Sequence, residues 1–231
     1  MFETAIVLGG TGAVGSQLVT RLTQRDDVAN VIVLSRRELD VAQAFPDAVA
    51  AKIRVQIVDI DALEEQAKPL MPEGSLAFIA LGTTKKQAGS HAAFRHIDHD
   101  RVLAFARACQ FAGVKQVGVV TALGANPRSP SFYNRVKGEV ERDIQALGLP
   151  SVFFARPSLL LGRPNDGRFT EKTASSLLTP IASLLPDAVR PITTQCVAAA
   201  MIKKAFNTDG KPSVFLLSNA DMHSMARKPH T

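Results

Sequence analysis

Short apolar runs alternate with longer amphipathic stretches over about the first 160 residues of the chain. The apolar runs are rich in β-branched residues and end at turn-forming or charged residues, a pattern that predicts buried strands. They lie at residues 4–8, 31–35, 54–58, 76–81, 116–120 and 151–155. Between them, residues 91–112 and 132–147 carry apolar side chains at helical spacing. Strands and helices that alternate in this way predict an α/β fold with a three-layer, doubly wound parallel sheet.

The alternation loosens after Pro157. The remaining pattern predicts a loop at residues 162–169, helices at 169–186 and 193–207, and a strand at 212–218. No internal repeat or low-complexity linker separates this part from the rest. We therefore interpret residues 1–231 as a single Rossmann domain, in which residues 157–231 form a C-terminal elaboration on the substrate side.

The composition suits an aliphatic core and argues against a nucleic-acid partner. The chain has 231 residues, 46% of them hydrophobic, with no tryptophan and 6% aromatic residues, which is enough for a full core. The net charge of +6 comes from scattered pairs such as Arg36–Arg37 and Lys85–Lys86. A basic stripe with interleaved aromatic residues, which nucleic-acid binding would favour, is missing from the sequence. A small-molecule substrate is the expected partner, and an oligomer stays open.

The sequence also bears on compartment and membrane insertion. No apolar run reaches the eighteen or so residues that a membrane span needs, so no span is predicted. The chain enters its first strand almost at once, which leaves no room for a signal peptide. We therefore expect a cytoplasmic protein.

A glycine-rich turn, GGTGAVG, joins the first predicted strand to the helix that follows it. This placement is typical of a dinucleotide-binding turn. Gly9 would allow the sharp turn out of the strand, Gly12 the close approach of a pyrophosphate, and Gly15 the packing of the helix on the sheet. Thr11 and Val14 complete the turn. Backbone N–H groups and the positive end of the helix dipole would face the phosphates.

The end of the second predicted strand distinguishes NADP from NAD. An acidic residue there would bind the 2′-hydroxyl of the ribose in NAD, but the sequence has Ser35, Arg36 and Arg37, and Glu38 follows one residue too late. A hydroxyl and two guanidinium groups suit the 2′-phosphate of NADP. We predict NADP and leave NAD open. The alternative is that both arginines are solvated loop residues.

Two further strand ends should line the same site, because ligands of open α/β sheets bind outside the carboxyl ends of the strands. Asp59 and Ile60 follow the third predicted strand, where they would contact the adenine. Leu81, Gly82 and Thr83 follow the fourth and would lie behind the cofactor. These assignments rest on position more than on residue type.

The single tyrosine of the chain lies four residues before a lysine in the helical stretch 132–147. Tyr133 and Lys137 would therefore share a helix face. A free phenol has a pKa of about 10 and is a poor acid or base near neutral pH, but a nearby ammonium favours the phenolate. We predict Tyr133 as the catalytic acid or base, while Lys137 would also bind the nicotinamide ribose. Thr121, at the end of the fifth predicted strand, would hydrogen-bond the substrate oxygen. The alternative is a surface helix turn with a solvated lysine.

These residues resemble a known family. GGTGAVG with a downstream YNRVK is similar to the short-chain dehydrogenase/reductase superfamily. The stretches LGTTKKQAGS, VTALGANPRS, YNRVKGEVE and ARPSLLLG resemble its atypical extended members, related to the Tat-interacting oxidoreductase-like proteins. The resemblance runs from Ala5 to about Phe206. It implies a Rossmann core, NADP binding, a catalytic Tyr–Lys pair and a loop at Pro157 near the nicotinamide. The usual catalytic serine is Thr121 here, and the asparagine of the family's proton relay has no assigned counterpart.

The function that follows is an NADP-dependent oxidoreductase that transfers hydride to or from a small carbonyl or alcohol. Two alternatives stay open: an NADP(H)-binding regulatory or protein-interaction module with little turnover, and a nucleotide-dependent epimerase or isomerase. His96 and Asp100 have the helical spacing of metal ligands, but no second ligand cluster accompanies them. No metal site is predicted.

Overall fold

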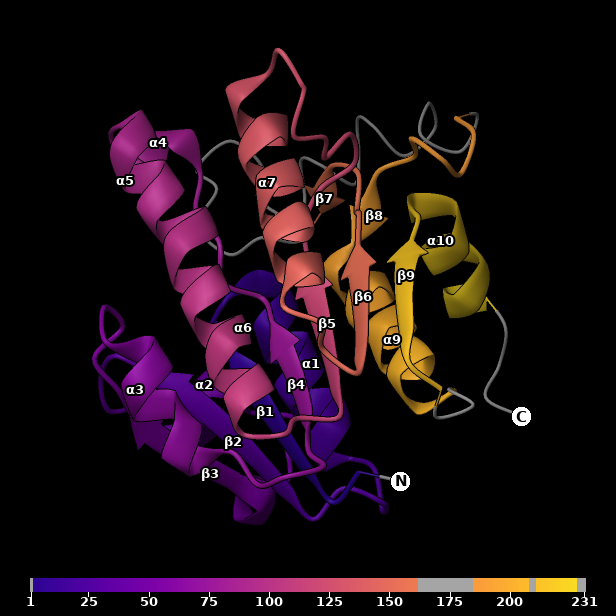
Figure 1. Cartoon of the computed structure of the whole chain (residues 1–231). Coiled ribbons are helices and arrows are strands. Elements are labelled where there is room, and N and C mark those ends of the chain that lie inside the picture. Colours follow the sequence, from indigo (N-terminus) through magenta and orange to yellow (C-terminus); the bar gives the residue numbers. More distant parts are fainter. Residues whose placement is uncertain (1, 162–184, 208–210, 228–231) are drawn as a thin grey trace.

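A parallel sheet of seven strands forms the centre of the computed structural model, which describes residues 2–161, 185–207 and 211–227 (Figure 1). The strands are β1 (Thr4–Leu8), β2 (Asn30–Ser35), β3 (Ile53–Ile57), β4 (Leu76–Ile79), β5 (Gln116–Val120), β6 (Ser151–Ala155) and β9 (Ser213–Leu217). Their order across the sheet is β3-β2-β1-β4-β5-β6-β9. From β1 the chain adds β2 and β3 on one side of the sheet, and then crosses to add β4 on the other side of β1. This reversal is the switch point at which doubly wound sheets bind ligands.

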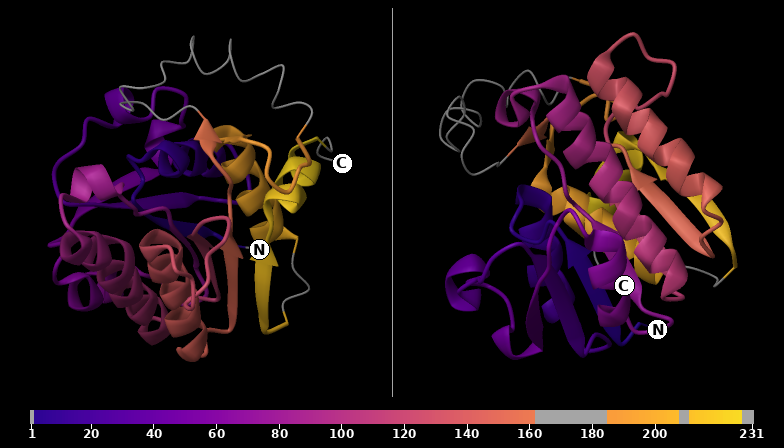
Figure 2. Two further views of the ribbon diagram at one scale, coloured as in Figure 1. Left: turned by 90° about the horizontal axis from the view of Figure 1, so that it is seen from above. Right: turned by 60° about the vertical axis from the view of Figure 1, so that its left-hand side comes forward.

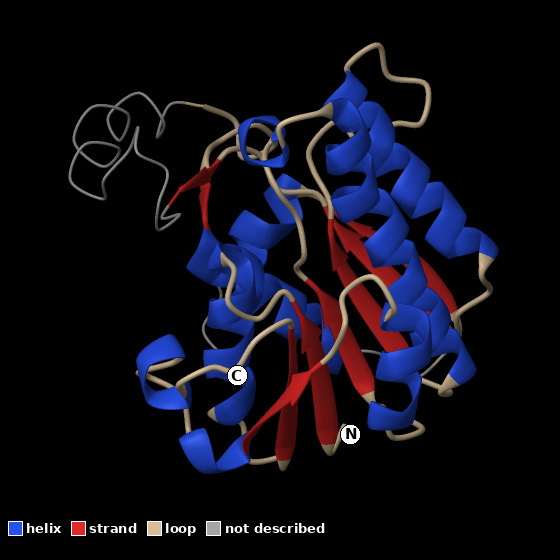
Figure 3. Cartoon of the chain, turned by 90° about the vertical axis from the view of Figure 1, so that its left-hand side faces the viewer, coloured by secondary structure: helices blue, strands red, loops and turns tan. Residues whose placement is uncertain are grey.

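Helices cover both faces of the sheet (Figures 2 and 3). The helices are α1 (Ala13–Thr23), α2 (Val41–Ala44), α3 (Leu63–Ala67), α4 (Lys85–Ala88), α5 (His91–Arg95), α6 (Arg101–Phe111), α7 (Phe132–Ala146), α9 (Thr194–Phe206) and α10 (Asn219–Arg227). Side chains of α1, α9 and α10 share one core cluster, and side chains of α3, α6 and α7 share the other. A two-stranded sheet of β7 (Leu160–Leu161) and β8 (Ile192–Thr193) lies beside the main one. The predicted three-layer fold is confirmed.

Strand residues divide between the two cores by the alternation that a strand imposes. In β1, Ala5 and Val7 contact the α1 side, whereas Ile6 and Leu8 contact the α6 side. All five residues of β1 are buried, because a central parallel strand has helices on both faces. This explains why the predicted strands appear in the sequence as unbroken apolar runs.

The predicted elements recur with local differences. Residues 91–112 do not form one regular α-helix, because the π-helical turn His96–Asp100 separates α5 from α6. The expected helix at 193–207 and strand at 212–218 are present as α9 and β9. The predicted loop at 162–169 and most of the predicted helix at 169–186 lie outside the described residues.

Close packing of α1 against the end of β1 depends on Gly15. A Cβ atom added at Gly15 would lie 2.0 Å from the carbonyl oxygen of Gly9 and 2.8 Å from its carbonyl carbon. Both are backbone atoms, so neither can move aside without displacing the turn. The glycine therefore sets how closely the helix approaches the strand.

We expect Gly15→Ala to lower the free energy of unfolding by about 2 kcal/mol or more, because the added methyl overlaps backbone atoms. Urea unfolding followed by circular dichroism measures this loss. Ser16→Ala, on the next residue of the same helix, is the matched control and should change stability by less than about 0.5 kcal/mol. Equal stability of the two variants would contradict the packing described for Gly15.

Candidate functional site

The glycine-rich turn between β1 and α1 is tight and leads into an open helix N-terminus. Gly9 has a φ of +80°, a conformation that favours glycine, and its carbonyl accepts the N–H of Gly12 at 3.0 Å. Gly12 is the N-cap residue of α1; no side chain caps this end, and the first turn holds no acidic residue. Val14 is buried, and Thr11 is exposed. The first N–H groups and the positive end of the helix dipole can therefore bind an anion.

The carboxyl end of β2 carries a buried serine and two exposed arginines. The Ser35 hydroxyl donates to the carbonyl of Arg37 at 2.7 Å and accepts the N–H of Arg37 at 3.3 Å, which closes a turn. Arg36 and Arg37 are exposed, and neither guanidinium pairs with a carboxylate among the residues that the structure describes. Two unpaired cations thus stand at the tip of β2.

The ends of β3 and β4 lie on either side of the β2–β1 pair. Asp59 is exposed, and its carboxylate accepts the N–H of Asp61 at 3.0 Å. That hydrogen bond uses one carboxylate oxygen of Asp59, and the other accepts no hydrogen bond from the residues that the structure describes. Ile60 and Leu81 are half-buried and pack against the α6-side core. Both therefore present part of an apolar side chain at the edge of the sheet.

Lys137 and Asp98 form a buried ion pair beside the loop that follows β4. The Lys137 Nζ lies 2.7 Å from Oδ1 of Asp98, whose side chain is 1% exposed. The other oxygen of Asp98 accepts the N–H of Thr83 at 2.8 Å. A Cβ atom at Gly82 would lie 3.2 Å from Oδ1 of Asp98 and 3.6 Å from the Lys137 Nζ, so the backbone of Gly82 runs directly beside the ion pair. The structure thus brings Gly82, Thr83 and Lys137 together around the carboxylate of Asp98.

Tyr133 lies one helical turn before Lys137 on α7. Its ring is half-buried and lies 5.6 Å from the buried ring of Phe94. Its hydroxyl has no hydrogen-bond partner within the described ranges. Tyr133, Lys137 and Glu141 recur at intervals of four and so share one face of α7.

Thr121 belongs to a buried network rather than standing alone. Its hydroxyl donates to Oε1 of Glu141 at 2.6 Å, and Glu141 is 3% exposed. Arg156, just after β6, grips the same carboxylate with two nitrogens, one of them the Nε at 2.9 Å. These hydrogen bonds raise the pKa of Arg156 above its usual range. Because the Thr121 proton is directed to Glu141, a further contact of Thr121 would use its lone pairs.

Pro157 is buried next to this network, and its carbonyl accepts the N–H of Leu123 at 2.8 Å. The loops after β5 and β6 are therefore joined. The following residue is anchored as well: the Ser158 N–H donates to Oδ1 of Asn219 at 2.9 Å. The Asn219 amide also donates to the carbonyl of Arg190 at 2.8 Å, so α10 fixes both ends of the β7–β8 region.

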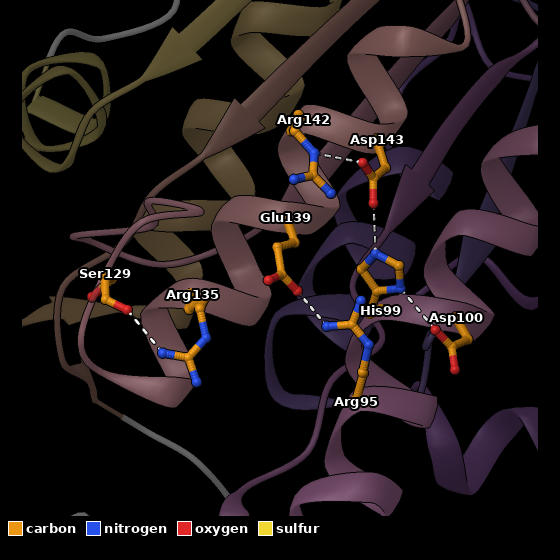
Figure 4. Close-up of polar contacts among 8 residues, drawn as sticks. All are labelled: Arg95, His99, Asp100, Ser129, Arg135, Glu139, Arg142 and Asp143. Carbon is orange, nitrogen blue, oxygen red and sulfur yellow. Dashed lines mark hydrogen bonds and ion pairs between the residues drawn. The ribbon is translucent and has the colours of Figure 1, made fainter.

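Two polar pairs connect α7 to the segments before α6, Arg95–Glu139 and His99–Asp143 (Figure 4). Two more support them locally, His99–Asp100 within the π-helical turn and Arg142–Asp143 within α7. The two ring nitrogens of His99 lie 2.7 Å and 2.9 Å from carboxylate oxygens. The hydrogen bond from Arg142, assisted by the one from His99, lowers the pKa of Asp143 despite its partial burial. This network holds α7, and with it Tyr133, against α5 and the π-helical turn.

A surface hollow, possible metal ligands and possible membrane spans add no second candidate site among the described residues. A shallow hollow at the amino edge of the sheet, lined by Lys115, Gln116, Ser151 and neighbouring residues, contains no carboxylate, histidine or cysteine. In the described ranges, no group of three or more His, Cys, Asp or Glu side chains is placed to bind a metal ion. None of the helices described there is long and apolar enough to cross a membrane.

Two site residues, Asp98 and Glu141, are missing from the sequence prediction. Glu141 had a signal, since it continues the spacing of Tyr133 and Lys137 by one more turn. Asp98 had a weaker one, a charged residue beside the apolar stripe of residues 91–112. It lies four residues after the buried Phe94 and four before the buried Val102, so helical spacing places it on the buried side.

Comparison with known proteins now adds to this geometry. The model of the NAD(P)H-binding family matches residues 9–180. The FMP52 protein of Coccidioides immitis strain RS, named mitochondrial, is 30% identical over 98% of this chain and 97% of its own length. Two solved structures share the fold alone. MoeE5 in complex with UDP-glucose and NAD has a TM-score of 0.67 and 17% identity, over 96% of this chain and 80% of its own. ElxO with NADP bound has a TM-score of 0.68 and 14% identity, over 96% and 100%.

One prediction is wrong. The sequence led us to expect a cytoplasmic protein, but the curated relatives are named mitochondrial proteins. The absence of a recognisable signal peptide did not carry that conclusion.

The resemblance to atypical short-chain enzymes is confirmed, since the family model covers most of the chain and the fold matches that of solved NAD- and NADP-bound proteins. The chain belongs to the NAD(P)H-binding family.

Proposed function

We propose that the chain is an NADP-dependent oxidoreductase that acts on a small carbonyl or alcohol. The observation that carries the proposal is the position of Lys137, which a buried carboxylate holds one helical turn from Tyr133 and next to Gly82. A tyrosine and an ammonium on one helix face, at the carboxyl edge of a sheet with a dinucleotide-type turn, suit proton transfer during hydride exchange.

The residues fit a dinucleotide at both ends. Gly9, Gly12 and the uncapped start of α1 would bind the pyrophosphate, and Gly82 leaves room beside the Lys137 ammonium for a ribose. When bound, the cofactor would supply or accept the hydride. Asp59, Ile60, Leu81 and Thr83 would line the cofactor between these ends, with Pro157 near the nicotinamide.

The chemistry left to the chain is proton transfer and orientation. Tyr133 would donate a proton to the substrate oxygen in reduction and accept one in oxidation. Lys137, which Asp98 holds one helical turn from Tyr133, would bind the nicotinamide ribose. Thr121, at the end of β5, would help to position the substrate oxygen.

The proposal for NADP over NAD rests on the tip of β2. Arg36 and Arg37 are exposed and unpaired within the described chain, and guanidinium groups bind phosphate strongly through charge-assisted hydrogen bonds. Ser35 holds the turn that presents them.

NADPH should bind at least about ten times more tightly than NADH, since two charge-assisted contacts of this kind contribute a kilocalorie or more. Arg36→Ala/Arg37→Ala should bring the two affinities within about threefold, mainly by weakening NADPH. Fluorescence titration of the reduced cofactors measures both constants. Arg107→Ala, on the exposed surface of α6, is the control. Unchanged NADPH preference in the double variant would assign the 2′-phosphate to other residues.

Tyr133→Phe removes only the phenolic oxygen, so NADPH affinity should stay unchanged while kcat falls by about 100-fold or more. A carbonyl panel followed by NADPH absorbance supplies the rates. Retained turnover in this variant would show that Tyr133 is not the proton donor. NADPH binding without turnover of any carbonyl by the parent protein would instead favour the regulatory or epimerase alternatives.

Asp98→Ala should lower the free energy of unfolding by about 3 kcal/mol, because it leaves the Lys137 ammonium buried without its carboxylate. It should also weaken NADPH binding, since the loop at Thr83 loses its anchor. Urea unfolding and cofactor titration measure the two effects. Asp61→Asn, which removes an exposed carboxylate from the neighbouring surface pair with Arg101, should have a much smaller effect on both. Similar losses in the two variants would show that burial of the Asp98 pair is unimportant.

A further inference from the structure

A group of cationic and aromatic side chains surrounds the start of α7, next to Tyr133. We call Lys85, His91, Phe132 and Arg135 the rim cluster. The rings of His91 and Phe132 stack with centroids 3.9 Å apart and planes at 11°. The Lys85 Nζ lies 5.6 Å from the Phe132 centroid, and the Arg135 Cζ lies 5.7 Å from it. Residues from α4, α5 and α7 thus converge on one aromatic ring.

The ring of Phe94 packs against both the rim cluster and Tyr133, the proposed proton donor. The buried Phe94 contacts Phe132 at 5.7 Å and Tyr133 at 5.6 Å between centroids. A small molecule that reached the Tyr133 hydroxyl would therefore have its far end near the rim cluster.

The two segments that form this region contain no acidic residue. Residues 82–97 and 121–138 hold lysine, arginine and histidine but neither aspartate nor glutamate. Carboxylates of the neighbouring helices already have cationic partners: Glu139 pairs with Arg95, Asp98 with Lys137, and Asp61 with Arg101. Lys85 and Arg135 pair with no carboxylate in the part of the chain that the structure describes.

The two cations are positioned by local structure without being neutralised. One nitrogen of Arg135 donates to the carbonyl of Ser129 at 3.0 Å (Figure 4), which leaves the remaining N–H groups of the guanidinium without a partner within the described ranges. Lys85 begins α4, where Thr84 and Gln87 form a capping box. A charge that is oriented but unpaired attracts anions more effectively than a mobile surface lysine.

We propose that the rim cluster binds an anionic group, a phosphate or a carboxylate, of the substrate that reacts at Tyr133. The part of this inference that concerns reaction at Tyr133 rests on the proposed function, whereas the part that concerns anion binding by the rim cluster does not. Arg135 and Lys85 would supply charge-assisted hydrogen bonds, while the Phe132–His91 stack provides an apolar floor for the chain that links the anion to the reacting carbon. The cofactor's own phosphates belong elsewhere, at α1 and at the tip of β2.

Matched pairs of ligands test the proposal. Glycerol 3-phosphate and glycerol are titrated calorimetrically into the protein, with and without NADP. Glyceraldehyde 3-phosphate is compared with glyceraldehyde, and succinic semialdehyde with butanal, as NADPH-dependent substrates. We expect the charged member of at least one pair to bind or react at least about tenfold better, and the pair that responds distinguishes phosphate from carboxylate.

Lys85→Ala/Arg135→Ala should reduce that preference to about one, and Lys85→Gln/Arg135→Gln provides a second variant should the first fail to fold. Lys115→Ala/Lys203→Ala removes the same charge at the amino edge of the sheet and should keep the preference. NADPH affinity should be the same in all of these proteins.

The outcomes separate the two proposals. Failure of the parent protein to bind NADPH overturns the proposed function, while the glycerol 3-phosphate titration without cofactor still decides the inference. NADPH binding with no preference for any charged ligand overturns the inference alone. A fall in NADPH affinity in the rim-cluster variant also overturns it, because the cations would then serve the cofactor. Loss of the preference in the control variant would show general electrostatic attraction instead of a site.

Discussion

The buried ion pair between Lys137 and Asp98 joins the three segments from which the candidate site is built. Lys137 comes from α7, Asp98 from the π-helical turn, and Thr83, bonded to the same carboxylate, from the loop after β4. Burying two charges costs free energy that their attraction repays only when the geometry is good and the remaining polar atoms are bonded. The second oxygen of Asp98 accepts a backbone N–H, so both oxygens of the buried carboxylate have a polar contact. The pair therefore defines where α7 and the β4 loop must stand.

Further polar contacts reinforce this arrangement along the length of α7. Glu141, one turn after Lys137 on α7, accepts hydrogen bonds from Thr121 and Arg156. These bonds connect α7 to the ends of β5 and β6. On the outer side, His99 and Arg95 bind carboxylates of α7. A helix held from both sides keeps Tyr133 and Lys137 in a fixed relation to the sheet, which proton transfer over hydrogen-bond distances requires.

The sequence predicted the parts of the structure that depend on local pattern. All seven main strands, α7 and α9 follow from apolar spacing, and the turn at Gly9, Gly12 and Gly15 follows from its position between a strand and a helix. The π-helical turn was not predicted, because the apolar residues of 91–112 lie near regular helical spacing. Asp98 lies four residues from both Phe94 and Val102, on the buried side, but its contacts with Lys137 and Thr83 depend on tertiary structure. Helix α10 was missed, since its buried residues, Asn219 and Met222, are too few to make a stripe.

The cofactor end and the substrate end of the proposed site differ in how readily they can be recognised in the sequence. The proposed cofactor end would use backbone N–H groups and a short motif, so a few consecutive residues suffice to recognise it. The proposed substrate end would be assembled from α4, α5 and α7, and its character comes from the lack of acidic residues in two distant segments. Neither segment is unusual alone, because a short run without carboxylates is common. Their meeting over Phe132 is a product of the fold, and it leaves the positive charges of Lys85 and Arg135 without compensation next to Tyr133. Net charge spread along the sequence thus becomes local charge at a site only through tertiary structure.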